Sequence, residues 1–291
     1  MKRKLVKQGA ATLMVSLPAK WAKENGLDKG DEVNVEEDGK RLVIKLSEET
    51  KKEQKAKINV SNYTPLVNRV LMALYIKGID ELEVTFSRPE EIKDFQKRVI
   101  NELIGFEILQ QSNTSMTIKD ISGSDSQEIE TIIQRIFFII DSMIEEFSEA
   151  LEKKQSLDPI IEIDSSINKF VNFCLRMLNK KGYPELHKTP QIYGIVTLLE
   201  EIGDVYKKLA QESQKTRISK EQVEILNDTR ISLRLFKELL FHYEKQKAVD
   251  FSEQYLKIKE KIKNKNKIDF LLGQLNDTII WLNSYLLVIS V

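Results

Sequence analysis

The sequence predicts a multidomain α/β plus all-α protein, in which a β-rich N-terminal unit precedes a small α/β segment and a helical bundle. Three observations lead to this fold class. Apolar and polar residues alternate at the strand period within residues 2–46, strand and helix patterns alternate over residues 57–121, and apolar residues recur at helical spacing from residue 129 onward. A chain of 291 residues, of which 41% are hydrophobic, can bury more than one core. We therefore expect domains over residues 1–50, 55–122 and 126–291.

The N-terminal unit combines short strands with one short helix. Residues 32–36, Glu-Val-Asn-Val-Glu, alternate polar with apolar, and Asp38-Gly39 indicates a two-residue hairpin turn before a strand over 41–46. Pro18 suits the first turn of the helix, where a missing N–H does no harm. About fifty residues with few large apolar side chains bury too little surface to be stable alone. This size predicts a homodimer.

The middle of the chain reads as a compact α/β unit. Residues 47–57 are crowded with Glu and Lys and indicate a solvated linker. Strands are expected over residues 58–60, 83–86, 106–111 and 116–121, and helices over 65–77 and 89–103.

Residues 122–126 are consecutive turn formers, and they predict a domain boundary. After them the pattern is helical almost to the end of the sequence. Helices are expected over residues 129–151, 160–178, 190–213, 219–246, 250–263 and 267–290. Six antiparallel helices make a bundle.

Composition excludes several classes of protein. Lys plus Arg and Asp plus Glu each total 45, so the net charge gives no overall attraction to nucleic acid or membrane. The lone Cys174 and the two histidines exclude a disulfide framework and a Cys/His zinc cluster. No glycine-rich phosphate loop or paired nucleophile and base is present, so we expect no enzyme. With no signal-peptide hydrophobic region and no uncharged stretch of ~20 residues, we expect a cytoplasmic protein without membrane insertion.

Positive charge is concentrated at the N-terminus. The first 23 residues contain no acid. The candidate DNA-binding residues are the cations of this stretch and two hydroxyl residues that could donate to phosphates or base edges: Lys2, Arg3, Lys4, Lys7, Thr12, Ser16, Lys20 and Lys23. Dimerisation would double the cations, which favours double-stranded DNA as a partner. The alternative is a solubilising basic tail.

Residues 7–21 and 26–33 resemble an AbrB/SpoVT-type swapped-hairpin DNA-binding domain. The resemblance implies that two chains interlock their hairpins into one β-barrel, and that Arg3, Lys4, Lys7 and Lys20 approach DNA. Many relatives carry arginine where this chain has lysine, which lacks the planar fork that contacts guanine. Some domains of this type serve as antitoxins or only as dimerisers.

The helical part carries oxygen ligands at a repeated spacing. Glu200 and Asp204 are four residues apart on one helical stripe, and Asp164 and Asn168 repeat this spacing. Hard oxygen ligands in this arrangement suit a divalent metal or iron. The alternative is an ordinary solvated helix face.

Residues 199–204, Leu-Glu-Glu-Ile-Gly-Asp, resemble the Glu-Arg-Ile-Gly-Asp signature of the PhoU family, and residues 164–168 resemble the Asp-x-x-Ile-Asn of its preceding helix. This resemblance implies a six-helix bundle of two three-helix repeats, a link to phosphate-uptake control, and metal clusters in some members. Residues 271–277 align with residues 198–204, but Gly273 replaces the glutamate. Only Asp277 remains there as a candidate ligand.

Over nearly its full length the chain resembles archaeal phosphate-uptake regulators. The leading hypothesis is a dimeric, DNA-binding transcriptional regulator of phosphate uptake, whose PhoU-like domain senses phosphate status through a metal, or through a phosphate transporter or its signalling proteins. The second hypothesis is a PhoU-like adaptor that controls a transporter by protein contact, with the N-terminal domain only dimerising it. A third is a metal-dependent phosphoester hydrolase built on the carboxylates.

Overall fold

The computed structural model describes residues 1–46, 53–122, 128–263 and 265–291. Contacts between residues divide the chain into two compact units, Met1–Gln54 and Lys55–Val291. The boundary predicted within residues 122–126 lies almost entirely outside the described residues. Among the helices that the structure describes, none is both long enough and apolar enough to cross a membrane.

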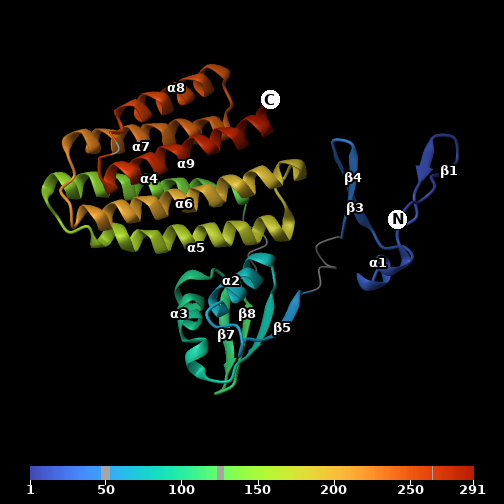
Figure 1. The fold of residues 1–291 in the computed structure, drawn as a ribbon. Coiled ribbons are helices and arrows are strands. Elements are labelled where there is room, and N and C mark those ends of the chain that lie inside the picture. Colours follow the sequence, from blue (N-terminus) through green and yellow to red (C-terminus); the bar gives the residue numbers. More distant parts are fainter. Residues whose placement is uncertain (47–52, 123–127, 264) are drawn as a thin grey trace. The chain divides into compact units, whose positions relative to one another are not determined.

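The first unit consists of two separate hairpins and a short helix (Figure 1). Its elements are β1 (Val6–Gln8), β2 (Thr12–Met14), α1 (Ala19–Glu24), β3 (Val33–Asp38) and β4 (Arg41–Leu46). Asp38 is paired with Arg41, so the two-residue turn is Gly39-Lys40, one residue later than the sequence predicts. Gly39 has φ 59°, a left-handed conformation that glycine adopts without strain, and this places the turn.

The first unit has no core of its own. In residues 1–46, no side chain that the structure describes is buried. The strand register puts Val33, Val35, Leu42, Ile44 and Leu46 on one face of the β3–β4 hairpin, as the alternation predicts. On this face Val35 is 57% and Leu42 66% exposed. The described residues of one chain form no closed barrel, and the swapped-hairpin barrel, which needs a second chain, stays a prediction.

The second unit begins with a mixed sheet that carries helices. Its elements are β5 (Lys55–Asn59), α2 (Val67–Lys77), β6 (Glu81–Thr85), a 3-10 turn (Pro89–Glu91), α3 (Lys93–Glu102), β7 (Phe106–Gln111) and β8 (Ser115–Asp120). The strand order is β5-β6-β8-β7, with β5 and β6 parallel and the other pairs antiparallel. The helix predicted over 89–103 is divided between the 3-10 turn and α3.

The two faces of this sheet differ in chemistry. Leu82 and Val84 of β6 are fully buried together with Phe95 of α3. The opposite face carries charges, where Lys55 of β5 donates to Glu81 at 2.7 Å and Lys57 lies 2.5 Å from Glu83. These cross-strand ion pairs explain why β5 begins at Lys55, inside the stretch that the sequence assigns to a linker.

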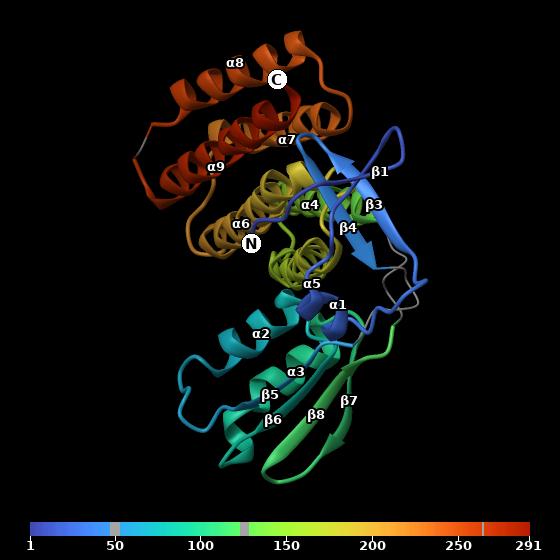
Figure 2. The same ribbon diagram turned by 90° about the vertical axis from the view of Figure 1, so that its right-hand side faces the viewer.

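Long helices make up the rest of the second unit, and they lie side by side in Figures 1 and 2. Within the described residues they are the six expected: α4 (Ile129–Lys153), α5 (Asp158–Lys181), α6 (Thr189–Ser213), α7 (Lys220–Phe241), α8 (Lys245–Lys261) and α9 (Lys267–Ser290). The prediction was wrong at one joint, since α7 ends at Phe241 and α8 begins at Lys245. Glu244 is extended there and acts as the N-cap of α8.

The bundle core is aromatic and aliphatic, and glycine allows two helices to approach closely. Phe147, Phe173, Tyr206 and Phe236 are fully buried, from α4, α5, α6 and α7. A Cβ at Gly203 of α6 would lie 2.8 Å from Cδ1 of Ile167 on α5. The glycine of the Leu-Glu-Glu-Ile-Gly-Asp motif therefore serves the packing of α6 on α5.

Candidate functional site

The N-terminal candidates all lie on the surface of the first unit. Each of the predicted DNA-binding residues is exposed: Lys2, Arg3, Lys4, Lys7, Thr12, Ser16, Lys20 and Lys23. Lys7 lies on β1 and Thr12 on β2, while Lys20 and Lys23 lie on α1. The short strands and the helix therefore present these side chains to solvent, where a polyanion could reach them.

Most of these cations are not neutralised within the chain. Lys20 lies 3.7 Å from Glu24, and the two side chains are 87% and 61% exposed, so this pair contributes little stability. No ion pair with a described residue involves the other cations: Lys2, Arg3, Lys4, Lys7 and Lys23. Their charges are available to an external anion.

In the second unit the structure brings the predicted carboxylates of α5 and α6 together around a lysine. Asp164 is 3% exposed, and its Oδ2 accepts hydrogen bonds from Lys207 Nζ at 2.7 Å and Asn168 Nδ2 at 3.1 Å. The same ammonium lies 3.8 Å from Asp204. Lys207 was not predicted, although it follows Asp204 by three residues and so lies on the same helical stripe.

The carboxylate of Glu200 is strongly affected by this environment. Burial, and then the negative charges of Asp204, Glu201 and Asp164, raise the pKa of Glu200 to about 7. Burial opposes the charge of Lys207, but the hydrogen bond and charge of Asp164 outweigh it and raise the lysine pKa. Near neutral pH Glu200 is therefore partly protonated, while Lys207 keeps its positive charge.

The fifth predicted ligand lies elsewhere. Asp277 of α9 accepts a hydrogen bond from the Tyr255 hydroxyl at 3.0 Å. Among the described residues, no three or more His, Cys, Asp or Glu side chains converge in a way that could hold a metal ion. At the predicted metal site, the carboxylates of Asp164 and Asp204 lie beside the ammonium of Lys207.

A polar cavity adjoins the cluster. It has a volume of about 440 Å³, and its lining includes Asp164, Asn168 and Lys207 together with Arg98 and Glu102 of α3. Arg98 donates to Glu102 at 2.9 Å. No sequence pattern could have linked these α3 residues to α5, because only the packing of the α/β segment on the bundle brings them near.

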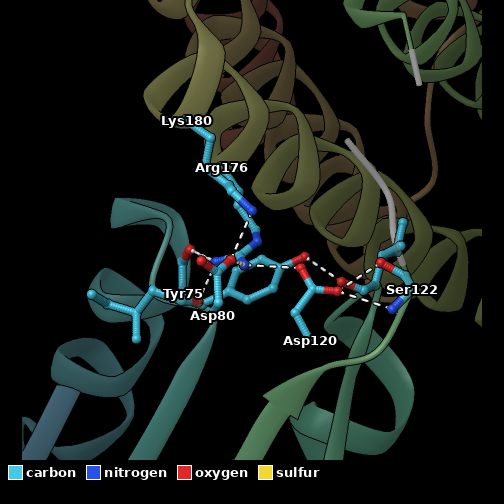
Figure 3. Close-up of polar contacts among 8 residues, drawn as sticks. Tyr75, Asp80, Asp120, Ser122, Arg176 and Lys180 are labelled. Atoms are coloured by element: carbon cyan, nitrogen blue, oxygen red, sulfur yellow. Dashed lines mark hydrogen bonds and ion pairs between the residues drawn. The ribbon is translucent and has the colours of Figure 1, made fainter. Parts of the chain in front are cut away.

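The α/β segment is fixed to α5 by a buried arginine, shown in Figure 3. Arg176 is fully buried, and its Nη1 donates to the carbonyl oxygens of Tyr75 at 2.8 Å and Ile79 at 2.7 Å. Its Nη2 donates to Asp80 at 3.0 Å and Asp120 at 2.9 Å. The end of α2, the start of β6 and the end of β8 therefore meet at one guanidinium.

Neighbouring groups complete this junction. Lys180, one turn further along α5, donates to Asp80 at 2.7 Å. Burial disfavours the charge of Asp120, but hydrogen bonds from Ser122 and Arg176 lower its pKa below the ordinary value. Sequence reasoning missed Arg176, although an arginine within the run Phe-Cys-Leu-Arg-Met-Leu is a detectable signal for a buried charge.

Comparison with known proteins identifies the first unit. Residues 6–55 match the family described as "Antidote-toxin recognition MazE, bacterial antitoxin". No curated protein and no solved structure matches the chain. The protein therefore carries a MazE/AbrB-type antitoxin-like domain at its N-terminus, followed by a small sheet and a helical C-terminal region.

Proposed function

We propose that the protein is a dimeric, DNA-binding transcriptional regulator, and that its helical region is a PhoU-like sensor in the control of phosphate uptake. The observation that carries the first part is the exposed, acid-free run of cations in a domain of the MazE/AbrB type. In this proposal the chain acts by binding and is not an enzyme.

The exposed apolar face of the β3–β4 hairpin supports the proposed dimer. One copy leaves Val35, Leu42 and Leu13 more than half exposed, and burying such side chains contributes about 1.5–3 kcal/mol each. A second copy of the same unit would cover these surfaces, and MazE/AbrB-like domains typically dimerise and bind DNA. The dimer would present every N-terminal cation twice.

Charge supports DNA as the ligand. Each phosphate that a cation neutralises releases about 0.9 condensed counterion from duplex DNA, so affinity falls steeply with salt. Lys4 and Lys7 have no ion pair among the described residues, and the pair of Lys20 with Glu24 is weak. These three lysines would therefore contact DNA phosphates rather than carboxylates of the protein itself.

The sensory part of the proposal is supported by the resemblance of the helical region to the PhoU family and by an internal repeat. The side chain of Gln274 on α9 donates to Glu201 on α6 at 2.9 Å. These two residues occupy the same place in the aligned stretches 198–204 and 271–277. Contact between equivalent positions is what two three-helix repeats, packed about a common axis, would produce.

In this proposal the helical region senses phosphate through a bound metal ion. Asp164, Glu200 and Asp204 supply only oxygens, which suits a hard cation, and Oδ1 of Asp164 is buried without a hydrogen-bond partner among the described residues. Because no three such side chains of the described residues converge as a ready metal site, the ion would bind only in place of the Lys207 ammonium, with Asp164, Asn168, Glu200 and Asp204 as its ligands. Such an ion would supply positive charge able to bind phosphate.

The DNA-binding proposal is tested by fluorescence anisotropy of the full-length protein on its own upstream DNA, over about 50–200 mM salt. The test variant replaces Lys4, Lys7 and Lys20 by alanine, and the matched control replaces Lys29 and Lys40 of the same unit. Wild type and control are expected to bind with a steep salt dependence. The triple variant should lose most affinity and most of the salt slope.

Two other outcomes would reject this reading. Equal binding by the triple variant would mean that other residues contact the DNA. No binding by wild type, with or without phosphate and metal, would favour the adaptor hypothesis, in which the first unit only dimerises the chain and the effect on a phosphate transporter survives the triple substitution.

The metal proposal is tested by the melting temperature with added Mn²⁺ or Fe³⁺. Binding to the folded state raises the melting temperature by mass action. The rise should be lost in Asp164→Asn and in Asp204→Asn and kept in Asp277→Asn. A rise of equal size in all four proteins would place the metal elsewhere, and no rise in wild type would reject the site.

A further inference from the structure

A second, larger cavity lies at the end of the bundle where three helices meet. It has a volume of about 860 Å³ and is lined by the end of α4, the joint between α6 and α7, and the first turn of α7. A neighbouring cavity of about 330 Å³ shares Leu151, Lys154 and Ser213 with it. This region lies outside the carboxylate cluster and outside the N-terminal unit.

The larger cavity is rich in cations. Its lining includes Lys154, Lys215, Arg217 and Lys220, against the acids Glu152 and Glu224. All four cations are exposed, and no ion pair with a described residue involves any of them. Positive charge is thus concentrated around a hollow with too few acids to neutralise it.

Two nearby acids are already occupied by other lysines. Glu212 accepts from Lys267 at 2.7 Å, and Glu221 accepts from Lys263. Lys263 lies between α8 and α9, and Lys267 is the first residue of α9. The carboxylates beside the cavity therefore do little to neutralise its own cations.

Backbone and hydroxyl groups add to the anion preference. The cavity includes Ser219, the N-cap of α7, and this helix of 22 residues directs the positive end of its dipole toward the cavity. The hydroxyl oxygen of Ser213, which also lines the cavity, is buried without a hydrogen-bond partner among the described residues.

Shape and apolar lining indicate a small molecule rather than a polymer. Leu151, Ile218 and Val223 contribute half-buried apolar surface to the cavity. Small-molecule sites are concave, commonly about 300–1,000 Å³, and combine apolar walls with a few charged groups. A flat basic surface would suit a nucleic acid, whereas this one is an open hollow bordered by three helix ends.

We propose that this cavity binds a phosphoanion, whose phosphate groups contact Lys154, Arg217 and Lys220; where the ligand is organic, its apolar part packs on Leu151 and Ile218. The ligand is either inorganic phosphate or an organic phosphoanion of about mononucleotide size. This inference assigns a binding site to a signalling ligand. It does not depend on DNA binding, because ligand binding is measured in the absence of DNA.

Lys154 provides a substitution that separates binding from folding. It follows α4 in the left-handed conformation, with φ 54°, where glycine is usual and a lysine is strained. Lys154→Gly removes the charge while relieving the backbone, so the variant should be at least as stable as wild type. Loss of binding in this variant cannot be attributed to unfolding.

The experiment is isothermal titration calorimetry of the full-length protein with ATP, inorganic phosphate, adenosine and a random-sequence DNA duplex. The variants are Lys154→Gly and the double variant Lys154→Gly/Arg217→Gln. The matched control is Lys245→Gln, the exposed first residue of α8, which lies beyond the far end of α7, a helix whose 22 residues span about 33 Å. Wild type and control should bind ATP equally, and the double variant about ten-fold or more weakly.

The ligands distinguish the sources of the phosphate. Equal affinity for inorganic phosphate and ATP would identify the phosphate group as sufficient, and tighter binding of ATP would identify an organic phosphoanion; both support the site. The proposal is overturned if neither binds, if adenosine binds as well as ATP, or if the double variant binds ATP like wild type. Loss of duplex binding rather than ATP binding in the double variant would make this a nucleic-acid surface.

Failure here and failure of the regulator proposal are distinguishable. If ATP and phosphate do not bind while the Lys4, Lys7 and Lys20 variant still loses upstream DNA, only the cavity inference falls. If ATP binds and DNA does not, the cavity stands and the DNA-binding proposal falls.

Discussion

Nη2 of Arg176 lies 2.9 Å from Oδ2 of Asp120, and this buried ion pair ties α5 of the bundle to the end of β8. The guanidinium also lies beside an edge-to-face aromatic pair, 5.0 Å from the ring centroids of both Tyr75 and Phe106. A charge so fully enclosed is tolerated because acceptors surround it. The α/β segment and the bundle are consequently held together in one unit by a defined contact.

Arg176→Met is expected to destabilise the second unit by about 3–5 kcal/mol, because Asp80 and Asp120 both lose the buried guanidinium that neutralises them, while Lys180 stays beside Asp80. Arg176→Lys should lose less stability, since lysine keeps the positive charge but lacks the planar fork of the guanidinium. Urea unfolding followed by far-UV circular dichroism measures the difference. The control is Arg135→Met, an exposed arginine stacked on Phe138, which should cost less than about 1 kcal/mol. Equal losses would contradict the assigned role.

Substitution by alanine should change stability in opposite directions at two helical glycines. At Gly203 a Cβ would meet Ile167 at 2.8 Å, so Gly203→Ala is expected to cost about 1–3 kcal/mol through overpacking. At Gly273 nothing lies within 4 Å, so Gly273→Ala should stabilise by about 0.5–1 kcal/mol through helix propensity. Melting temperatures report both. Adding Ile167→Val should recover part of the Gly203→Ala loss, and an unchanged loss would show that the clash lies elsewhere.

Glu200 should make stability depend on pH. Its folded pKa of about 7 lies above the ordinary 4.5, so between these values the folded chain keeps a proton that the unfolded chain has released. The free energy of unfolding therefore falls as pH rises through this window and levels off above it. Glu200→Gln cannot ionise, so its stability advantage over wild type should grow from pH 4.5 to 7. A flat difference between Glu200→Gln and wild type would refute the raised pKa.

Cys174 should be unreactive in the folded protein. It is fully buried, and burial raises the pKa of its thiol to about 12, so almost no thiolate is present at neutral pH. A thiol reagent should label the chain only at the rate at which it unfolds, and addition of urea should accelerate labelling in step with loss of helix. Fast labelling of the native protein would show that α5 opens without global unfolding.

Local sequence patterns were sufficient to predict most of the bundle helices and the sequence repeat that they contain. Apolar residues at helical spacing predict α4, α5, α6 and α9 to within a few residues, because burial of one stripe dictates that spacing. They failed at the joint between α7 and α8, where no proline or glycine marks the break. They also missed the start of β5, because Lys55 and Lys57 resemble linker residues until their partners on β6 are known.

By itself the sequence determined most of the elements and where charge is clustered along the chain, since propensity, periodicity and charge are properties of neighbours along the chain. It could therefore point to the N-terminal cations and to the acids of α5 and α6. Only the tertiary structure decided that Lys207 lies among those acids, that Arg176 binds Asp80 and Asp120, 96 and 56 residues away, and that Lys154 and Arg217 line one cavity. Their chemistry depends on distance in space, and contacts between residues far apart in sequence are set by the packing of whole helices.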